Sequence, residues 1–173
     1  MCFALQQGNT STILTPIEGV DSVVAFYGYQ APNQASSDTG FEIPNRASLL
    51  LYRDGNDNVS LVYLLDIAGD GSGGSYTLSY SGAEGFQVLV YDDTLNAGND
   101  TYNLDEANGS GTIDWVWAGC CGDGMAMGYL EGDFCINFFE VNSSGLTGTT
   151  VWDTENSTFD LDGSGVFSLC GIL

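Results

Sequence analysis

The sequence contains no lysine and no histidine, and only Arg46 and Arg53 balance 23 acidic residues. Without a histidine or lysine base, the chain has no Ser–His, Cys–His or Ser–Lys nucleophilic pair, and a Cys/His zinc site is excluded. The acids would allow a glycosidase-type carboxylate pair, but no such pair stands out, and we expect no enzymatic activity. The formal net charge of −21 excludes nucleic acid and anionic membranes as partners.

Long apolar runs are also missing. No segment approaches the length of a membrane span, so we expect no membrane insertion. The first seven residues, MCFALQQ, have neither a basic region nor an apolar run long enough for a signal peptide. We therefore expect the export signal of this chain to lie upstream of it.

Short β-rich runs separated by turn residues dominate the rest of the sequence, and no long amphipathic helix is predicted. With 24 glycines, this pattern predicts an all-β fold, a two-sheet sandwich with jelly-roll-like connections and disulfide-pinned loops. The run LVYLL lacks polar alternation, which indicates a strand that is covered on both faces. The expected strands are Ser11–Thr15, Ser22–Tyr29, Ala47–Arg53, Val59–Ile67, Ser75–Ser81, Phe86–Tyr91, Thr112–Trp117, Phe134–Val141, Thr149–Asp153 and Val166–Leu169.

Two hairpins are predicted. The turn formers of residues 54–57 separate two β-rich runs, and residues 81–85 separate a second pair. We expect one sandwich domain over residues 18–173, preceded by an extended arm, residues 1–17. The arm is predicted either to add as a donated strand to a neighbouring subunit or to form an ordinary first strand tied down by Cys2.

Aspartate outnumbers glutamate 16 to 7, which favours loops with oxygen ligands for calcium. The stretch FDLDGSGVFSL places Asp160, Asp162 and Ser164 at positions 1, 3 and 5 of an EF-hand-like loop, but Gly171 stands where a bidentate glutamate is needed. The stretch is therefore either a turn that leads into a strand or a calcium site completed by a distant acid.

Acidic residues at two strand ends form further candidate calcium ligands. Asp66 and Asp70 flank one strand end, and Asp92 and Asp93 follow another, with Asn99, Asp100 and Asp105 close behind. Solvated loop ends are the alternative interpretation for each cluster.

Five cysteines in a chain without histidine predict disulfides in an oxidising compartment. Adjacent Cys120 and Cys121 would form a strained ring, so we expect one of them to pair with Cys135 and Cys2 to pair with Cys170. The other adjacent cysteine would be free or bonded to another chain. Glycosylation sequons further support secretion and occur at Asn9, Asn58, Asn99, Asn108, Asn142 and Asn156.

The segment Asp114–Phe139 is the most distinctive in the chain. Trp115 and Trp117 lie on one face of a predicted strand, and a glycine-rich loop with both adjacent cysteines and Asp123 follows. The arrangement W-x-W…C-C-x-D-G…L…F-C-I resembles a segment of secreted surface proteins of unassigned function, and the chain as a whole resembles secreted calcium-binding β-sandwich surface proteins. The functional interpretation is a ligand or calcium loop held rigid by the Cys135 bridge. The alternative is a core tryptophan strand with a disulfide-pinned loop.

Two functions remain compatible with these features. The first is a structural subunit of an extracellular, glycosylated filament or surface layer, a homopolymer assembled from copies of itself and stabilised by calcium. In its arm the chain is similar to strand-donating pilus subunits. The alternative is a calcium-dependent, lectin-like module that binds glycans, with Trp152 beside Asp153 stacking on a sugar ring.

Overall fold

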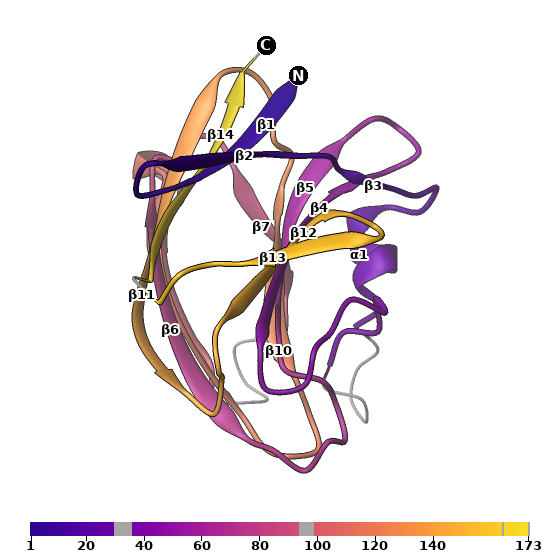
Figure 1. Ribbon diagram of the computed structural model, residues 1–173, viewed down its shortest axis with the longest axis vertical. Coiled ribbons are helices and arrows are strands. Elements are labelled where there is room, and N and C mark those ends of the chain that lie inside the picture. Colours follow the sequence, from indigo (N-terminus) through magenta and orange to yellow (C-terminus); the bar gives the residue numbers. More distant parts are fainter. Residues whose placement is uncertain (30–35, 94–98, 164, 173) are drawn as a thin grey trace.

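Two packed β-sheets make up the protein in a computed structural model that describes residues 1–29, 36–93, 99–163 and 165–172. Figure 1 shows the two layers edge-on. The first sheet contains, in spatial order, β2 (Thr10–Leu14), β1 (Cys2–Gln7), β14 (Val166–Ile172), β11 (Phe134–Ser144), β6 (Gly74–Ser81), β9 (Ser110–Trp117) and β8 (Thr101–Asp105). The short 3₁₀ helix η1 (Glu106–Asn108) joins β8 to β9. The predicted all-β, two-sheet sandwich is confirmed.

The second sheet also has seven strands. Its order is β13 (Ser157–Asp160), β12 (Thr149–Thr154), β4 (Ala47–Arg53), β5 (Val59–Leu65), β10 (Asp123–Gly128) and β7 (Gln87–Tyr91), and β3 (Ile17–Glu18) pairs with β4. Strands β12 and β3 run parallel to β4, and the other pairs in this sheet are antiparallel.

The first predicted hairpin is confirmed as β4–β5. Asp54 organises its turn, because its carboxylate accepts hydrogen bonds from the backbone of Asn56 (2.8 Å) and Asn58 (3.0 Å). Asp57 takes a positive φ of 63°, a conformation that Asp adopts more readily than most side chains.

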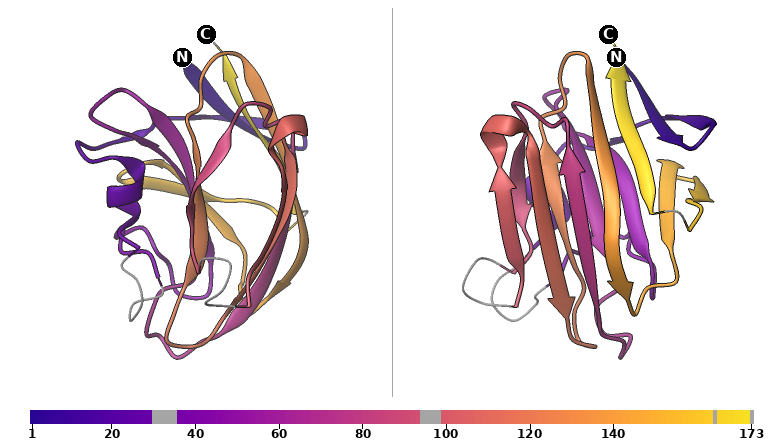
Figure 2. Two further views of the ribbon diagram at one scale, coloured as in Figure 1. Left: turned by 180° about the vertical axis from the view of Figure 1, so that it is seen from behind. Right: turned by 90° about the vertical axis from the view of Figure 1, so that its left-hand side faces the viewer.

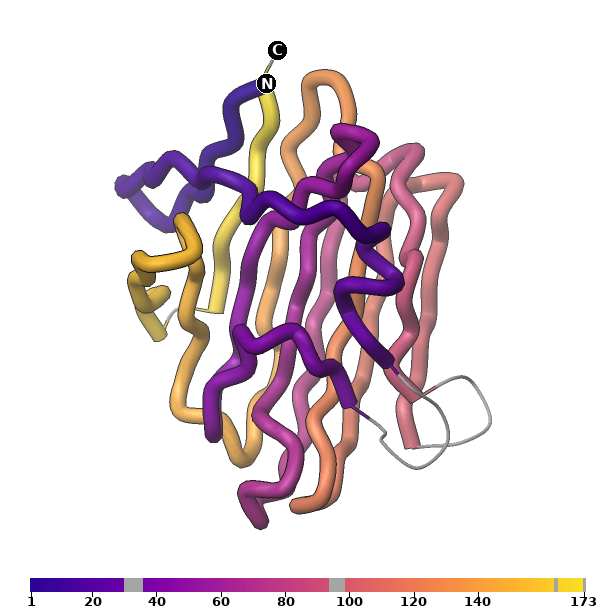
Figure 3. Tube along the Cα trace, turned by 90° about the vertical axis from the view of Figure 1, so that its right-hand side faces the viewer, coloured from indigo at the N-terminus to yellow at the C-terminus, as the bar shows by residue number. Residues whose placement is uncertain are grey.

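The run LVYLL lies in β5, where every residue is buried, as predicted. Leu61, Tyr63 and Leu65 face the core between the sheets, and Val62 and Leu64 face outward. A short helix, α1 (Val23–Tyr27), covers that outward side together with Tyr29 and Phe41, and Figure 3 shows the helix over this sheet. The outer side of the second sheet is therefore a second, smaller core.

Helix α1 corrects the predicted strand Ser22–Tyr29. The Ser22 hydroxyl accepts a hydrogen bond from the backbone N–H of Ala25, and Gly28 ends the helix in the left-handed conformation. Capping and tertiary packing thus override the β propensity of VVAFY.

The second predicted hairpin is wrong. Strand β6 lies in the first sheet, between β11 and β9, and β7 lies in the second sheet beside β10. Residues 82–86 therefore cross from one layer to the other, since β6 and β7 each bury one face in the shared core. The strands β3, β8, β10 and β13 were not predicted. Strand β1 matches the alternative interpretation of the arm as an ordinary first strand, but Cys2 does not tie it down.

The N-terminal residues are extended but not detached from the sandwich. Strand β1 pairs with β14 from Cys2↔Ile172 to Gln6↔Ser168 and with β2 on its other side. Phe3 and Leu5 lie in the core. Figure 1 shows both termini side by side at one end of the molecule. Donation of this segment to another copy stays a prediction.

The structure corrects the expected cysteine pairing. Adjacent Cys120 and Cys121 are bonded to each other, and Cys135 is bonded to Cys170. Cys135 and Cys170 are register partners on the neighbouring strands β11 and β14, which places their side chains together. Cys2 is an exposed free thiol.

Candidate metal centre

Four aspartates from three chain segments meet where the two sheets approach each other. Asp92 and Asp93 follow β7, Asp123 begins β10, and Asp100 directly precedes β8. Strands β7 and β10 are neighbours in the second sheet, whereas β8 belongs to the first. The cluster of Asp92, Asp93, Asp100 and Asp123, called the aspartate cluster below, therefore bridges both layers of the sandwich.

Carboxylate oxygens of Asp93, Asp100 and Asp123 all lie within 4.8 Å of one another. This spacing matches a shared calcium ion, because two oxygens that each lie about 2.4 Å from one ion can be no more than about 4.8 Å apart. Asp123 is 1% exposed and Asp92 is fully buried.

Several oxygens of the aspartate cluster lack a hydrogen-bond donor. Within the described part of the chain, one buried carboxylate oxygen each of Asp92, Asp100 and Asp123 has no hydrogen-bond partner. The other oxygen of Asp100 accepts the backbone N–H of Val116 at 2.9 Å, and Asp92 accepts the Tyr27 hydroxyl at 2.7 Å. Buried carboxylate oxygens normally have partners, so these three indicate a missing cation or proton.

The raised pKa values of the aspartate cluster also indicate a missing cation or proton. Burial raises the pKa of Asp92 to about 8, that of Asp100 to about 7 and that of Asp123 to about 9, and mutual repulsion among the carboxylates adds to each rise. The charged forms are therefore unfavourable near neutral pH unless a positive charge enters the cluster. No lysine exists to provide it, and the two arginines form ion pairs elsewhere.

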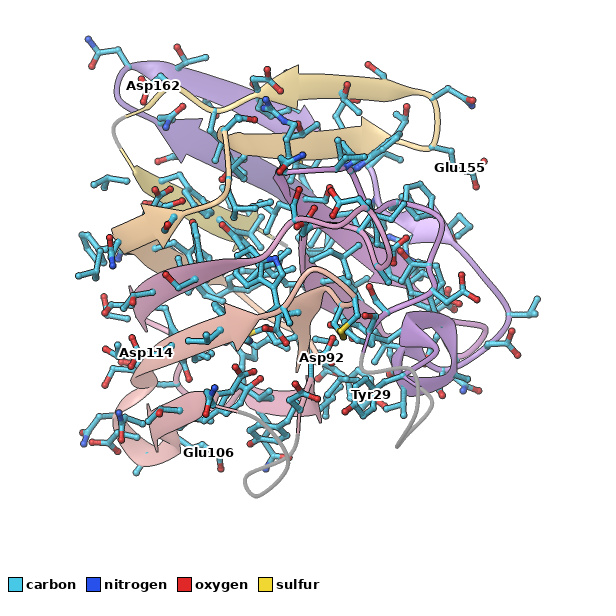
Figure 4. The ribbon with its side chains drawn as sticks, turned by 90° about the horizontal axis from the view of Figure 1, so that it is seen from below. Tyr29, Asp92, Glu106, Asp114, Glu155 and Asp162 are labelled. Carbon is cyan, nitrogen blue, oxygen red and sulfur yellow. A yellow bond between two sulfur atoms is a disulfide. The ribbon has the colours of Figure 1, made fainter. Side chains whose placement is uncertain are left out.

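Aromatic hydroxyl groups hold the aspartates in position. Tyr29 donates to Asp93 at 2.9 Å, and Tyr102 donates to the backbone carbonyl of Asp92 at 2.8 Å. The indole N–H of Trp115 bonds to the Tyr102 hydroxyl at 3.0 Å. Figure 4 shows Tyr29 and Asp92 close together. The predicted tryptophan strand thus supports the site from the core, as a positioning element.

Asp123 depends on a tight approach of β10 to β5. A Cβ atom at Gly124 would collide with the carbonyl oxygen of Tyr63 and lie 2.7 Å from the Tyr27 hydroxyl. The Cys120–Cys121 disulfide lies in the preceding turn, where the N–H of Gly122 donates to the Ser36 hydroxyl at 2.8 Å. Both features restrict the backbone that presents Asp123.

The residues present fit a hard divalent cation. The aspartate cluster offers only oxygen donors, which suit Ca²⁺ or Mg²⁺, while the nitrogen and thiolate donors that favour zinc are missing from it. Ligands from separate segments form an irregular set, and Ca²⁺ accepts irregular coordination more readily than Mg²⁺.

The raised pKa values predict an unusual pH dependence when divalent cations are removed. The folded chain then holds protons on carboxyls that are ionised in the unfolded chain, so stability should fall as the pH rises from about 4 through the folded pKa values of about 7 to 9. We expect the Tm measured in chelator to decrease steadily between pH 5 and pH 9.

Asp123→Asn should flatten this slope, whereas Asp70→Asn, which removes the same charge from an exposed residue, should not. A Tm in chelator that rises across this window would contradict the proton-occupied cluster.

Of the other predicted ligands, Asp66 and Asp70 do not converge. Asp66 is 1% exposed and accepts hydrogen bonds from the backbone of Asn45 (2.7 Å) and Ile67 (2.9 Å) and from the Trp117 indole (3.0 Å). Asp70 is exposed and caps the backbone N–H of Ser72 at 2.7 Å. Both carboxylates have structural partners without a metal.

In the stretch FDLDGSGVFSL, Phe159 and Asp160 end β13, and Val166–Leu169 begin β14. Asp160 forms an ion pair with Arg46 and also accepts a hydrogen bond from Thr150 at 3.0 Å, so its charge is neutralised. The Gln7 side chain accepts the backbone N–H of Asp162 at 2.8 Å. Ser164 lies outside the described residues, and a metal at this turn stays a prediction. Figure 4 shows Asp162 far from Asp92.

Trp152 is half-buried, and its ring packs edge-on against Phe41 at a centroid distance of 5.1 Å. This contact favours a packing role over sugar stacking. The sequon residues Asn9, Asn99, Asn108, Asn142 and Asn156 are exposed, whereas Asn58 is half-buried and donates its amide to Asp54 at 3.0 Å.

Comparison with protein-family models, with curated proteins and with solved structures finds no match to this chain. The two disulfides indicate an oxidising compartment. Within the described residues, no helix has the length and apolarity needed to cross a membrane.

Proposed function

We propose that the protein is an extracellular structural β-sandwich, stabilised by calcium at the aspartate cluster and assembled with copies of itself into a filament or surface layer. The observation that carries the calcium part is the set of three buried, unpartnered carboxylate oxygens beside the half-exposed Asp93. A bound cation would compensate these charges and join β7 and β10 to β8, and so connect the two sheets.

Disulfides and exposed sequons support the extracellular location. The assembly mode expected from the sequence is strand donation. It requires β1 to leave β14 and to reproduce the register Cys2↔Ile172 in a neighbouring subunit. The hairpin β1–β2 lies at an edge of the first sheet, which is where such an exchange is topologically simple.

Calcium-dependent glycan binding is a second candidate, favoured by one observation. Asp93 and Asp100 are only half-buried, and the Tyr29 ring lies beside Asp93. A cation held there would keep coordination positions open for two sugar hydroxyls, with an aromatic ring alongside.

Titration calorimetry tests the calcium site. Chelator-treated protein should bind about one Ca²⁺ per chain with a dissociation constant of about 10⁻⁴ to 10⁻³ M, the range of extracellular modules, and bind Mg²⁺ more weakly. Asp123→Asn should abolish binding, whereas Asp160→Asn should leave it unchanged. Wild-type protein that binds no calcium, with Tm equal in calcium and in chelator, would refute the proposal.

A further inference from the structure

One large surface of this acidic chain is almost uncharged. Along β6 the side chains that face away from the core are Ser75, Thr77, Ser79 and Ser81. On the outward positions of β14, β11, β6 and β9, the single carboxylate is Asp114, which accepts a hydrogen bond from Thr77 at 2.7 Å. This surface is called the outer face below. Figure 2 (right) shows it without a covering helix or loop.

Exposed apolar side chains concentrate on the same sheet. Among the described residues, ten large hydrophobic side chains are exposed, and six of them lie on strands of the first sheet: Ile13, Val116, Phe139, Val141, Val166 and Ile172. Phe139 and Val166 are register partners on β11 and β14, so they form a joint apolar ridge. Exposed apolar side chains that gather on one face mark an interaction surface more often than scattered ones do.

A shallow groove of about 630 Å³ runs beside this ridge, and its lining includes Ser79, Asn103, Thr112, Phe139 and one carboxylate, Asp105. Gly111 lets β9 pack closely on the core side of this groove, because a Cβ atom there would lie 2.8 Å from the Tyr80 ring and 2.9 Å from the Leu104 side chain. A ridge and a groove side by side are self-complementary, since a two-fold rotation sets the ridge of one copy into the groove of another.

We propose that the outer face is the surface through which two copies of this chain associate. The net charge of the chain is −21, and both arginines are already in ion pairs. Two copies that met through other surfaces would therefore bring carboxylates close together and repel each other, whereas contact through the outer face brings almost no charges together. Figure 4 labels Asp114 on the outward side of the first sheet.

The available area is sufficient. The four strands of the outer face, at about 4.8 Å spacing and with about eight residues of about 3.3 Å each, give about 500 Å². The outward positions of the neighbouring strands β1, β2 and β8, which add the carboxylate of Asp105, extend the face to about 700 to 800 Å². Stable protein dimers bury about 800 Å² per partner. The proposal deepens the self-assembly part of the proposed function and rests on it. It does not involve the aspartate cluster.

Analytical ultracentrifugation of the full chain at a fixed calcium concentration tests this interface. The wild-type protein should form concentration-dependent dimers, and association should strengthen with salt, because salt screens the repulsion between acidic copies. Val166→Glu should weaken the dimer about tenfold or more, since the two-fold axis introduces two buried carboxylates. Val20→Glu, which adds the same charge at an exposed valine outside the outer face, should leave association unchanged.

Circular dichroism and Tm confirm that both variants are folded. A wild-type chain that stays monomeric at all concentrations, or equal dissociation by Val166→Glu and Val20→Glu, would overturn the proposal. A wild-type chain that stays monomeric would also overturn the proposal if neutral polysaccharide slows its electrophoretic migration and Val166→Glu restores that migration. This result would assign the outer face to glycan binding.

Asn142 lies in a sequon on β11, so the measurement includes protein with N-glycans intact and protein with N-glycans removed. Dimers that form only after the N-glycans are removed would also contradict the proposed interface. Titration calorimetry with calcium distinguishes these outcomes from a failure of the proposed calcium site, because it measures calcium binding separately from association.

Discussion

Removal of calcium should lower the Tm of this protein by about 5 to 10 °C. At a calcium concentration about 100 times the dissociation constant, a ligand that binds only the folded chain adds about 2.7 kcal/mol to its stability. For a domain of this length, each kcal/mol corresponds to about 2 to 4 °C. The stabilisation arises because the cation neutralises the buried carboxylates of Asp92, Asp100 and Asp123 and joins the two sheets.

Differential scanning calorimetry in calcium and in chelator measures this shift. Asp123→Asn should eliminate the response to calcium and make the Tm in chelator equal to or higher than that of the wild type, because it removes one carboxylate from a repelling cluster. Asp70→Asn is the matched control and should keep the full calcium response. The same calcium shift in Asp123→Asn as in the wild type would place the ion elsewhere.

The sequence predicted the fold class because its signals are local. The hairpin β4–β5 follows from two β-rich runs with a turn of Asp54, Gly55, Asn56 and Asp57 between them, and Asp54 does bind the turn backbone. Burial of both faces of β5 follows from its unbroken apolar run.

Strand partners were less predictable, since sequence proximity does not determine which sheet a strand joins. The turn at residues 81–85 suggested a hairpin, yet β6 and β7 lie in different layers. The cysteine pairing failed for a related reason. Cys135 and Cys170 are 35 residues apart and become neighbours only through the β11–β14 register.

Two of the four residues of the aspartate cluster were predicted as metal ligands. The paired acids Asp92 and Asp93 at a strand end carried a recognisable signal, and Asp100 and Asp123 were noted nearby in sequence and in the cysteine loop. Their convergence depends on β8 and β10 meeting from different sheets, which no local pattern encodes. The FDLDGSG turn carried the stronger motif, but Asp160 binds Arg46.

Asp66→Ala should destabilise the protein by about 3 to 5 kcal/mol without changing its calcium affinity. The substitution leaves three donors without a partner, namely the half-buried backbone N–H groups of Asn45 and Ile67 and the buried Trp117 indole N–H. Each unpaired buried donor costs about 1 to 3 kcal/mol. Chemical denaturation measures the loss, and calorimetry measures the calcium affinity.

Asp66→Asn separates the charge of this side chain from its hydrogen bonds. It keeps an oxygen for the two backbone donors and loses the acceptor for Trp117, so the cost should be smaller, about 1 to 2 kcal/mol. If Asp66 were a metal ligand together with Asp70, as its position at a strand end suggested, both substitutions at Asp66 would weaken calcium binding. Unchanged calcium affinity in both variants, with stability lost in the order Ala then Asn, would identify Asp66 as the hydrogen-bond acceptor that fastens β5 to the first sheet.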